Sequence, residues 1–176
     1  MPWLTPDAHT EQVEAARDLV LRRLDRSAAP RAALAQLLAR KEVAPDVAQE
    51  VLDRLEAAGI IDDAAYAARL ARTRFAEKGA ARRAIADELR RKGLGEEHIR
   101  AALDQIDGDD EATAALRLAR KKLATTRALP TLTRRRRALA ALGRKGYGSG
   151  TATHAVEQAL AEEGITDGGN ASDWNV

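Results

Sequence analysis

The stretch Gly59-Ile60-Ile61-Asp62-Asp63-Ala64-Ala65-Tyr66-Ala67 reads as the end of one helix and the start of the next. Gly59 suits the left-handed residue that terminates a helix, because glycine has no side chain to oppose a positive φ. Asp62 or Asp63 suits the N-cap, where a carboxylate accepts hydrogen bonds from free backbone N–H groups. We therefore place a boundary between two structural units here and expect Asp62, Asp63 and Tyr66 to hold the two units together.

The sequence on either side of this boundary repeats with a shift of 51 residues and no gap. The paired positions are Leu19 and Leu70, Leu24 and Phe75, Leu34 and Ile85, Leu38 and Leu89, Lys41 and Lys92, Val43 and Leu94, and Leu52 and Leu103. A third copy follows with a shift of 53, which pairs Leu89 with Leu142 and Lys92 with Lys145. An internal repeat of this length indicates a row of small units that stack to bury their apolar faces.

The composition favours helix throughout the chain of 176 residues. Apolar residues make up 45% and aromatic residues only 3%, and alanine, leucine, arginine and glutamate are abundant. We predict an all-α protein of about nine helices, in which three tandem three-helix repeats form an elongated, curved, solenoid-like body. The expected ranges are a flexible tail over 1–10, repeats over 11–61, 62–108 and 109–163, and a disordered tail over 164–176.

Apolar spacing and helix breakers place the individual helices. We expect them over about 11–26, 30–41, 45–58, 63–78, 80–92, 96–106, 112–126, 131–145 and 152–163. In the eighth helix, Leu132, Leu139 and Leu142 are the expected core stripe. The glycine-rich residues 146–151 are expected to form a loop that holds four extra residues, because the third copy changes its shift from 53 to 57 there.

Several classes of site are excluded by the residues present. The chain has no cysteine, and its three histidines, His9, His98 and His154, lack the spacing of metal ligands. The segment Gly146-Tyr147-Gly148-Ser149-Gly150 lacks the strand and the Lys-Ser/Thr pair of a phosphate loop. No apolar run approaches the roughly 20 residues of a membrane span, and the N-terminus does not resemble a signal peptide. We expect a cytoplasmic monomer that is not an enzyme and carries no metal or cofactor.

Charge is segregated along the chain. Residues 1–68 carry a net charge of −4, residues 69–145 a net charge of +11, and residues 146–176 a net charge of −5. Within the middle, residues 112–156 hold 11 lysines and arginines and no acid. This bias favours a polyanionic partner over an ordinary surface of mixed sign.

The strongest basic feature is the run Arg134–Arg137. Four consecutive residues surround most of a helix, so one of them must lie near the apolar stripe, with its stem along the core and its head outward. The alternative for these and the other basic residues is a solvated face with local ion pairs. Nucleic acid would attract such a surface through counterion release, but no platform of aromatic residues for base stacking is present.

One motif carries a resemblance to a known family. It comprises Ile61-Asp62-Asp63-x-x-Tyr66-Ala67, the basic residues Arg69, Arg72 and Arg74, and then Glu88-Leu89-Arg90-x-Lys92-Gly93. With these spacings, residues 12–163 resemble the RecX family of recombination regulators, which consists of tandem three-helix repeats. The glycine of the first Lys-Gly turn is replaced here by Glu42.

The resemblance implies a partner and a function. RecX proteins bind RecA, the bacterial strand-exchange ATPase, or its filament on single-stranded DNA, and lower its ATPase, strand-exchange and coprotease activities. We expect a non-catalytic regulator of this kind, with weak direct DNA contact as a further option. The expected contact residues are Arg69, Arg72, Arg83, Arg90, Arg91, Arg117, Lys121, Arg134, Arg135, Arg136 and Arg137. The alternative is a stand-alone nucleic-acid-binding module that acts through the same basic residues.

Overall fold

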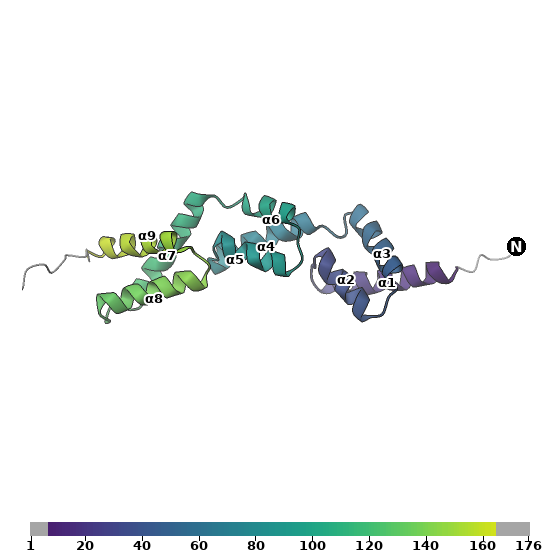
Figure 1. The fold of residues 1–176 in the computed structure, drawn as a ribbon, viewed down its shortest axis with the longest axis horizontal. Helices are drawn as coiled ribbons and strands as arrows, with labels where there is room; N and C mark the ends of the chain where they lie inside the picture. The colour runs from purple at the N-terminus through teal and green to yellow at the C-terminus, as the bar shows by residue number, and fades with distance from the viewer. Residues whose placement is uncertain (1–6, 165–176) are drawn as a thin grey trace, which may run out of the picture. The chain divides into compact units, whose positions relative to one another are not determined.

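The computed structural model describes residues 7–164, which contain nine α-helices and no strand (Figure 1). The all-α repeat fold that the sequence predicts is therefore confirmed. The helices are α1 (Ala8–Arg26), α2 (Arg31–Arg40), α3 (Pro45–Ala57), α4 (Asp63–Lys78), α5 (Arg82–Arg91), α6 (Glu96–Leu103), α7 (Gly108–Ala124), α8 (Thr131–Arg144) and α9 (Ser149–Glu162).

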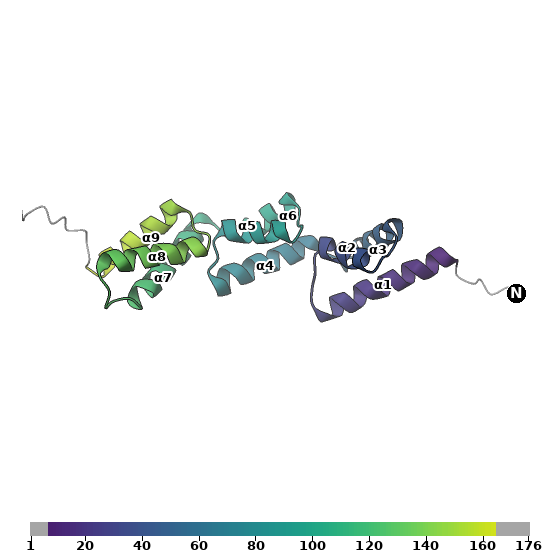
Figure 2. The same cartoon turned by 60° about the horizontal axis from the view of Figure 1, so that its bottom comes forward.

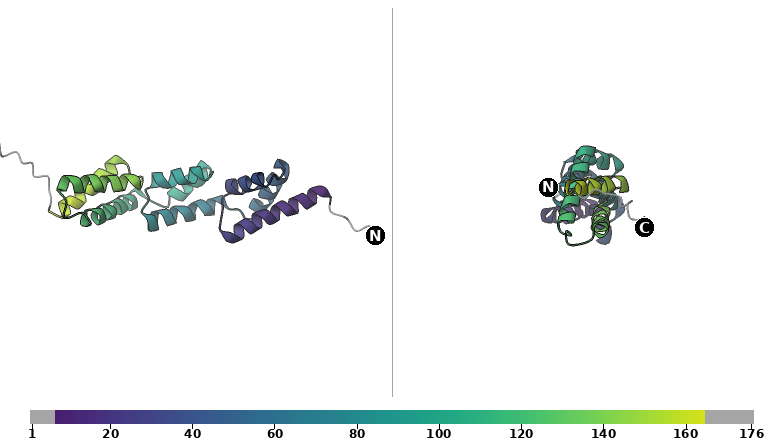
Figure 3. Two further views of the ribbon diagram at one scale, coloured as in Figure 1. Left: turned by 90° about the horizontal axis from the view of Figure 1, so that it is seen from below. Right: turned by 90° about the vertical axis from the view of Figure 1, so that its left-hand side faces the viewer.

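The described residues form two compact units. The first unit comprises residues 7–72 and 86–105, and in it α1 packs against α2 and α3 (Figure 2). The second unit comprises residues 73–85 and 106–164, and in it α7, α8 and α9 pack together (Figure 3). Residues of the predicted second repeat thus belong to both units, and the division into three repeats stays a prediction.

Each unit has its own apolar core. In the first unit, Val20, Leu34 and Leu38 are fully buried and pack with the apolar face of α3. In the second unit, α7 contributes the small Ala115 and Ala119 and the larger Leu123 to the core. The other large core residues of this unit are Leu142, Tyr147, Val156 and Leu160.

Three helices begin earlier than the sequence predicts. One is α7, which starts at Gly108 and not near residue 112, because Asp107 caps it by accepting a hydrogen bond of 2.7 Å from the backbone N–H of Asp110. The α1 helix starts at Ala8 because Asp7 caps it, accepting a hydrogen bond of 2.7 Å from the backbone N–H of Thr10. The expected flexible tail is therefore wrong for residues 7–10, and residues 1–6 lie outside the described range. The α9 helix starts at Ser149 with Gly148 as its N-cap, so the expected loop is wrong for residues 149–151. Residues 165–176 of the expected C-terminal tail also lie outside the described range.

The orientation of α8 also differs from the expected one. Leu132 is 78% exposed, while Ala138, Ala141 and Leu142 are buried together with Arg134. Alanine, which gives a weaker apolar signal than leucine, therefore supplies much of the buried face of this helix. This rotation decides which of the four consecutive arginines points inward.

Candidate interaction surface and the joints that support it

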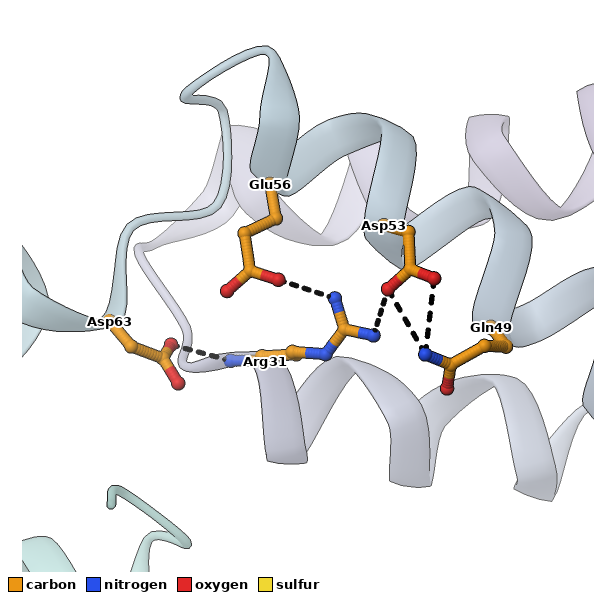
Figure 4. Close-up of polar contacts among 5 residues, drawn as sticks. All are labelled: Arg31, Gln49, Asp53, Glu56 and Asp63. Carbon is orange, nitrogen blue, oxygen red and sulfur yellow. Dashed lines mark hydrogen bonds and ion pairs between the residues drawn. The ribbon is translucent and has the colours of Figure 1, made fainter. Parts of the chain in front are cut away.

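The start of α2 is joined to the start of α4 by one hydrogen bond. The backbone N–H of Arg31 donates to Asp63 Oδ1 at 2.8 Å (Figure 4). The Arg31 guanidinium meanwhile bridges two α3 carboxylates, those of Asp53 at 2.6 Å and Glu56 at 2.7 Å. The hydrogen bond from Arg31 holds the pKa of the Asp53 carboxyl below its usual value. Arg31 thereby links three helices of the first unit.

Asp62 and Asp63, two of the three expected junction residues, have different roles. Asp62, and not Asp63, caps α4, because its carboxylate accepts a hydrogen bond of 2.8 Å from the N–H of Ala65. Asp63 instead reaches α2. Tyr66 is half-buried, and its backbone N–H donates to the carbonyl of Asp62 at 3.0 Å.

A glycine completes this first joint. Gly93 has a φ of +81°, and a Cβ atom added to it would lie 2.5 Å from the Cβ of Ala32. The turn between α5 and α6 can therefore contact α2 so closely only because residue 93 has no side chain. Arg31, Ala32, Asp63 and Gly93 together form the first joint.

The second unit contains a second joint of the same design. The backbone N–H of Arg82, at the start of α5, donates to Glu111 Oε1 of α7 at 2.9 Å. Gly146 has a φ of +90°, and a Cβ added to it would lie 2.5 Å from the Cβ of Ala84. Two of the joint positions keep the spacing of the sequence repeat, because Arg31 and Arg82 are 51 residues apart and Gly93 and Gly146 are 53 apart, whereas the acceptors Asp63 and Glu111 are 48 apart.

Three further contacts reinforce the second joint. The N–H of Ala81 donates to the carbonyl of Lys145 at 2.8 Å, and Lys145 Nζ donates to the carbonyl of Lys78 at 2.6 Å. The hydroxyl of Tyr147 donates to the carbonyl of Gly79 at 3.2 Å. Burial raises the pKa of the Tyr147 phenol, Glu111 raises it further, and Arg117 opposes them.

Arg134 lies inside the second unit and not on its surface. Its side chain is 4% exposed, and it donates to the carbonyl of Leu123 at 3.0 Å and to Glu163 at 2.5 Å. The expectation that its head points outward to a partner is wrong, because the end of α7 and Glu163 provide acceptors inside the unit. Arg134 therefore stabilises the packing of α7, α8 and the end of α9.

Two more acids near the end of the described chain neutralise basic residues. Glu162 binds the Arg120 guanidinium through both carboxylate oxygens at 2.7 Å, which holds the pKa of the Glu162 carboxyl below its usual value. Glu157 pairs with Arg135 at 2.6 Å. The sequence reasoning missed these partners, although the acids directly follow the acid-free segment 112–156.

The expected contact residues of the first unit differ in whether an acid of the described chain pairs with them. Arg69, Arg72 and Arg91 are exposed and form no ion pair with another described residue. Arg90 is exposed but pairs with Glu96 at 2.6 Å and with Asp87 at 3.2 Å. The hydrogen bond that Arg90 donates to Glu96 raises the pKa of Arg90.

The second unit presents a separate set of exposed cations, which we call the α7–α8 cation set. It consists of Arg117 and Lys121 on α7 and Arg136 and Arg137 on α8, none of which pairs with an acid among residues 7–164. Arg117 and Lys121 are four residues apart and so share one face of α7. Arg83 of α5 is exposed in the same unit and is likewise unpaired within that range.

Other kinds of site find little support in the part of the chain that is described. Residues 7–164 contain no cluster of three or more His, Asp or Glu side chains able to hold a metal ion. Within the same range, no helix combines the length and the hydropathy that crossing a bilayer requires.

Comparison with known proteins assigns the family. Residues 62–103 match the second three-helix domain of RecX, and residues 109–156 match the third. The chain is 42% identical over 150 residues to the regulatory protein RecX of Thermobifida fusca, a match that covers 85% of this chain and 81% of that protein. The chain belongs to the RecX family. The RecX of Streptomyces coelicolor is also 42% identical, over 88% of this chain and 82% of its own length.

Solved RecX structures share the fold. A crystal structure of a regulatory protein RecX matches with a TM-score of 0.72 and 28% identity, over 82% of this chain and 71% of that chain. The RecX of Lactobacillus salivarius matches with a TM-score of 0.78 over 86% of this chain and 98% of that chain, and its identity of 16% supports the fold alone. Membership in a family of regulatory proteins gives this chain a regulatory role.

Proposed function

We propose that this RecX protein binds RecA or the RecA filament on single-stranded DNA and inhibits its ATPase, strand-exchange and coprotease activities. Family membership carries the proposal, since the relatives are regulatory proteins and the match covers most of both chains. The protein acts by binding and not by catalysis, in the cytoplasm, and as a monomer.

The α7–α8 cation set supports an anionic partner. Arg117, Lys121, Arg136 and Arg137 are exposed and unneutralised within the described range, whereas Arg120, Arg134 and Arg135 are occupied by α9 and Glu163. Like charges that no acid offsets attract phosphates or an acidic protein surface. The proposed contact surface therefore includes the exposed cations and excludes Arg134.

Paired charge removals test this assignment. In RecA ATPase assays on single-stranded DNA, R117A/K121A and R136A/R137A should each raise the half-inhibitory concentration about two- to thirtyfold, since two exposed contacts at about 0.2–1 kcal/mol each give that range. The matched control is R26A/R40A, which removes the same charge from exposed positions on α1 and α2. Equal inhibition by all three double variants and the wild type would remove the α7–α8 cation set from the contact surface.

A second candidate function rests on the same cations. A stand-alone nucleic-acid-binding module would bind DNA without RecA, and its affinity would fall with salt by a log–log slope of roughly −0.7 to −0.9 per phosphate contacted. Tyr147 is buried, and Tyr66 and Phe75 are half-buried, so among the described residues this binding would depend mainly on phosphate contacts. Tight binding to single-stranded DNA in the absence of RecA would favour this function.

A further inference from the structure

The C-terminal part of the sequence supplies acids to the arginines of α7 and α8. Residues 146–176 contain five acids and no lysine or arginine. Three of these acids lie within the described range, and each of the three binds an arginine of α7 or α8. The pairs are Glu157 with Arg135 at 2.6 Å, Glu162 with Arg120 at 2.7 Å, and Glu163 with Arg134 at 2.5 Å.

The other two acids, Asp167 and Asp173, belong to residues 165–176, outside the described range. We call these residues the 165–176 segment. It contains no basic residue that could pair with its own acids. The α7–α8 cation set is the complementary group, because none of its four cations pairs with an acid among residues 7–164. Directly after Asp173 comes Trp174, whose indole ring suits stacking against an arginine guanidinium.

The chain leaves α9 close to these cations. The last described acids hold the end of α9 on Arg120 of α7 and on Arg134 of α8. An extended chain advances at most about 3.6 Å per residue, so Asp167 lies within about 11 Å of Gly164 and Asp173 within about 32 Å. The α7 helix has 17 residues and is about 25 Å long. The 165–176 segment is therefore long enough to bring both acids to the α7–α8 cation set.

We propose that the 165–176 segment occupies the α7–α8 cation set of its own chain and competes with the anionic partner for these cations. Asp167 and Asp173 continue the pairing that the three α9-end acids begin. Two carboxylates against four cations leave the surface positive, so a polyanion with more charges displaces the segment. The regulation of RecA inhibition by this competition rests on the proposed function.

Binding of a fluorescein-labelled oligothymidylate to the full-length protein tests the competition without RecA. The segment lowers the apparent affinity in proportion to the fraction of molecules whose cations are free. At low ionic strength, D167N/D173N should bind the probe about two- to thirtyfold more tightly than the wild type, the range that two exposed ion pairs give. The matched control D25N/E97Q removes two exposed acids from the first unit and should bind like the wild type. Equal affinities of D167N/D173N and D25N/E97Q would overturn the proposal.

The place of the segment is read from the fluorescence of Trp174. The W3F variant leaves Trp174 as the single tryptophan, and acrylamide quenching reports how accessible its indole ring is. At low salt, quenching should be about twofold weaker than in a free peptide of residues 165–176, and high salt should remove the difference by screening the ion pairs. Adding R136A/R137A to W3F should remove most of this protection, whereas R26A/R40A should preserve it.

Three outcomes of the quenching experiment would overturn the proposal. One is quenching equal to that of the free peptide at low salt. Another is protection that R136A/R137A leaves intact, since the segment would then lie elsewhere. The third is protection that increases with protein concentration, which would place the segment on a second copy of the chain.

An inhibition assay then connects the segment to the regulated protein. If the wild type inhibits the RecA ATPase, D167N/D173N should lower the half-inhibitory concentration by a factor similar to its gain in oligothymidylate affinity, while D25N/E97Q should not. An unchanged half-inhibitory concentration would contradict competition with the anionic partner. If the wild type itself does not inhibit RecA, the proposed function fails, and the quenching and oligothymidylate measurements still decide whether the segment occupies the cations.

Discussion

The backbone N–H of Arg31 donates a hydrogen bond of 2.8 Å to the carboxylate of Asp63, which lies 32 residues further along the chain. Arg82 and Glu111 make the same contact at 2.9 Å across 29 residues. A helix start leaves its first N–H groups without partners in its own helix. In this RecX protein, a following helix supplies the missing acceptor, so capping a helix and joining two helices are one interaction.

We expect D63A to destabilise the first unit by about 1–2 kcal/mol, the usual cost of losing a capping carboxylate. The loss leaves the half-buried N–H of Arg31 without its acceptor. Urea unfolding followed by circular dichroism measures the effect. D25A removes an exposed acid from α1 and should stay within about 0.5 kcal/mol of the wild type. If D63A were as stable as D25A, the contact would not hold the helices together.

Two glycine substitutions distinguish the free-energy cost of a positive φ from the cost of a steric clash at the second joint. Gly59 and Gly146 both have positive φ values, +70° and +90°, but a Cβ at position 59 would meet nothing within 4 Å, whereas one at position 146 would lie 2.5 Å from Ala84. G59A should cost about 1 kcal/mol for its φ alone. G146A should cost about 1–3 kcal/mol more, because it also overpacks the joint. If G59A and G146A lost equal stability in thermal unfolding, the second joint would accommodate the added Cβ atom at no cost in free energy.

The buried ion pair of Arg134 should be a strong contributor to stability. R134A leaves Glu163 and the carbonyl of Leu123 without their donor. Breaking a buried pair costs about 3–5 kcal/mol, and we expect the lower end because the Glu163 side chain is 24% exposed. R136A removes an exposed neighbour and should change stability by no more than about 0.5 kcal/mol. Similar denaturant midpoints for the two variants would contradict the buried role of Arg134.

Tyr147 should make stability depend on pH in the alkaline range. Burial raises the pKa of its phenol above the usual value near 10, so the folded state holds this proton more tightly than the unfolded state. Its contribution is complete below the ordinary phenol pKa and is lost as pH rises through the higher folded pKa. Between pH 8 and pH 11, the wild type should therefore lose more unfolding free energy than Y147F, in which only the other groups titrate. Parallel losses in the two proteins would rule out this linkage.

Much of the fold is readable from the sequence because it depends on local signals and on the repeat. The spacing of apolar residues predicts the nine helices of the described range, and the repeat pairs Lys92-Gly93 with Lys145-Gly146. The family motif around Asp62 and Asp63 predicts RecX membership, which the comparisons confirm. These features need no knowledge of distant contacts.

Whether each basic residue is buried, paired with an acid or exposed could not be predicted in the same way. Which of Arg134–Arg137 points inward depends on the rotation of α8, and Ala138 and Ala141 set that rotation more than Leu132 does. The acids that neutralise Arg120 and Arg134 lie 42 and 29 residues away, beyond the reach of local pairing rules. Only the packed structure separates the α7–α8 cation set from the arginines that α9 and Glu163 occupy.

The most direct test of the central claim is the ATPase activity of RecA on single-stranded DNA, titrated with this RecX protein from far below the RecA concentration. Binding of the protein alone to the same DNA is measured in the same buffer. Our account predicts inhibition at substoichiometric amounts together with weak DNA binding by the protein alone. Inhibition that appears only once the protein has coated the DNA, or no inhibition at all, would contradict a RecA-directed regulator.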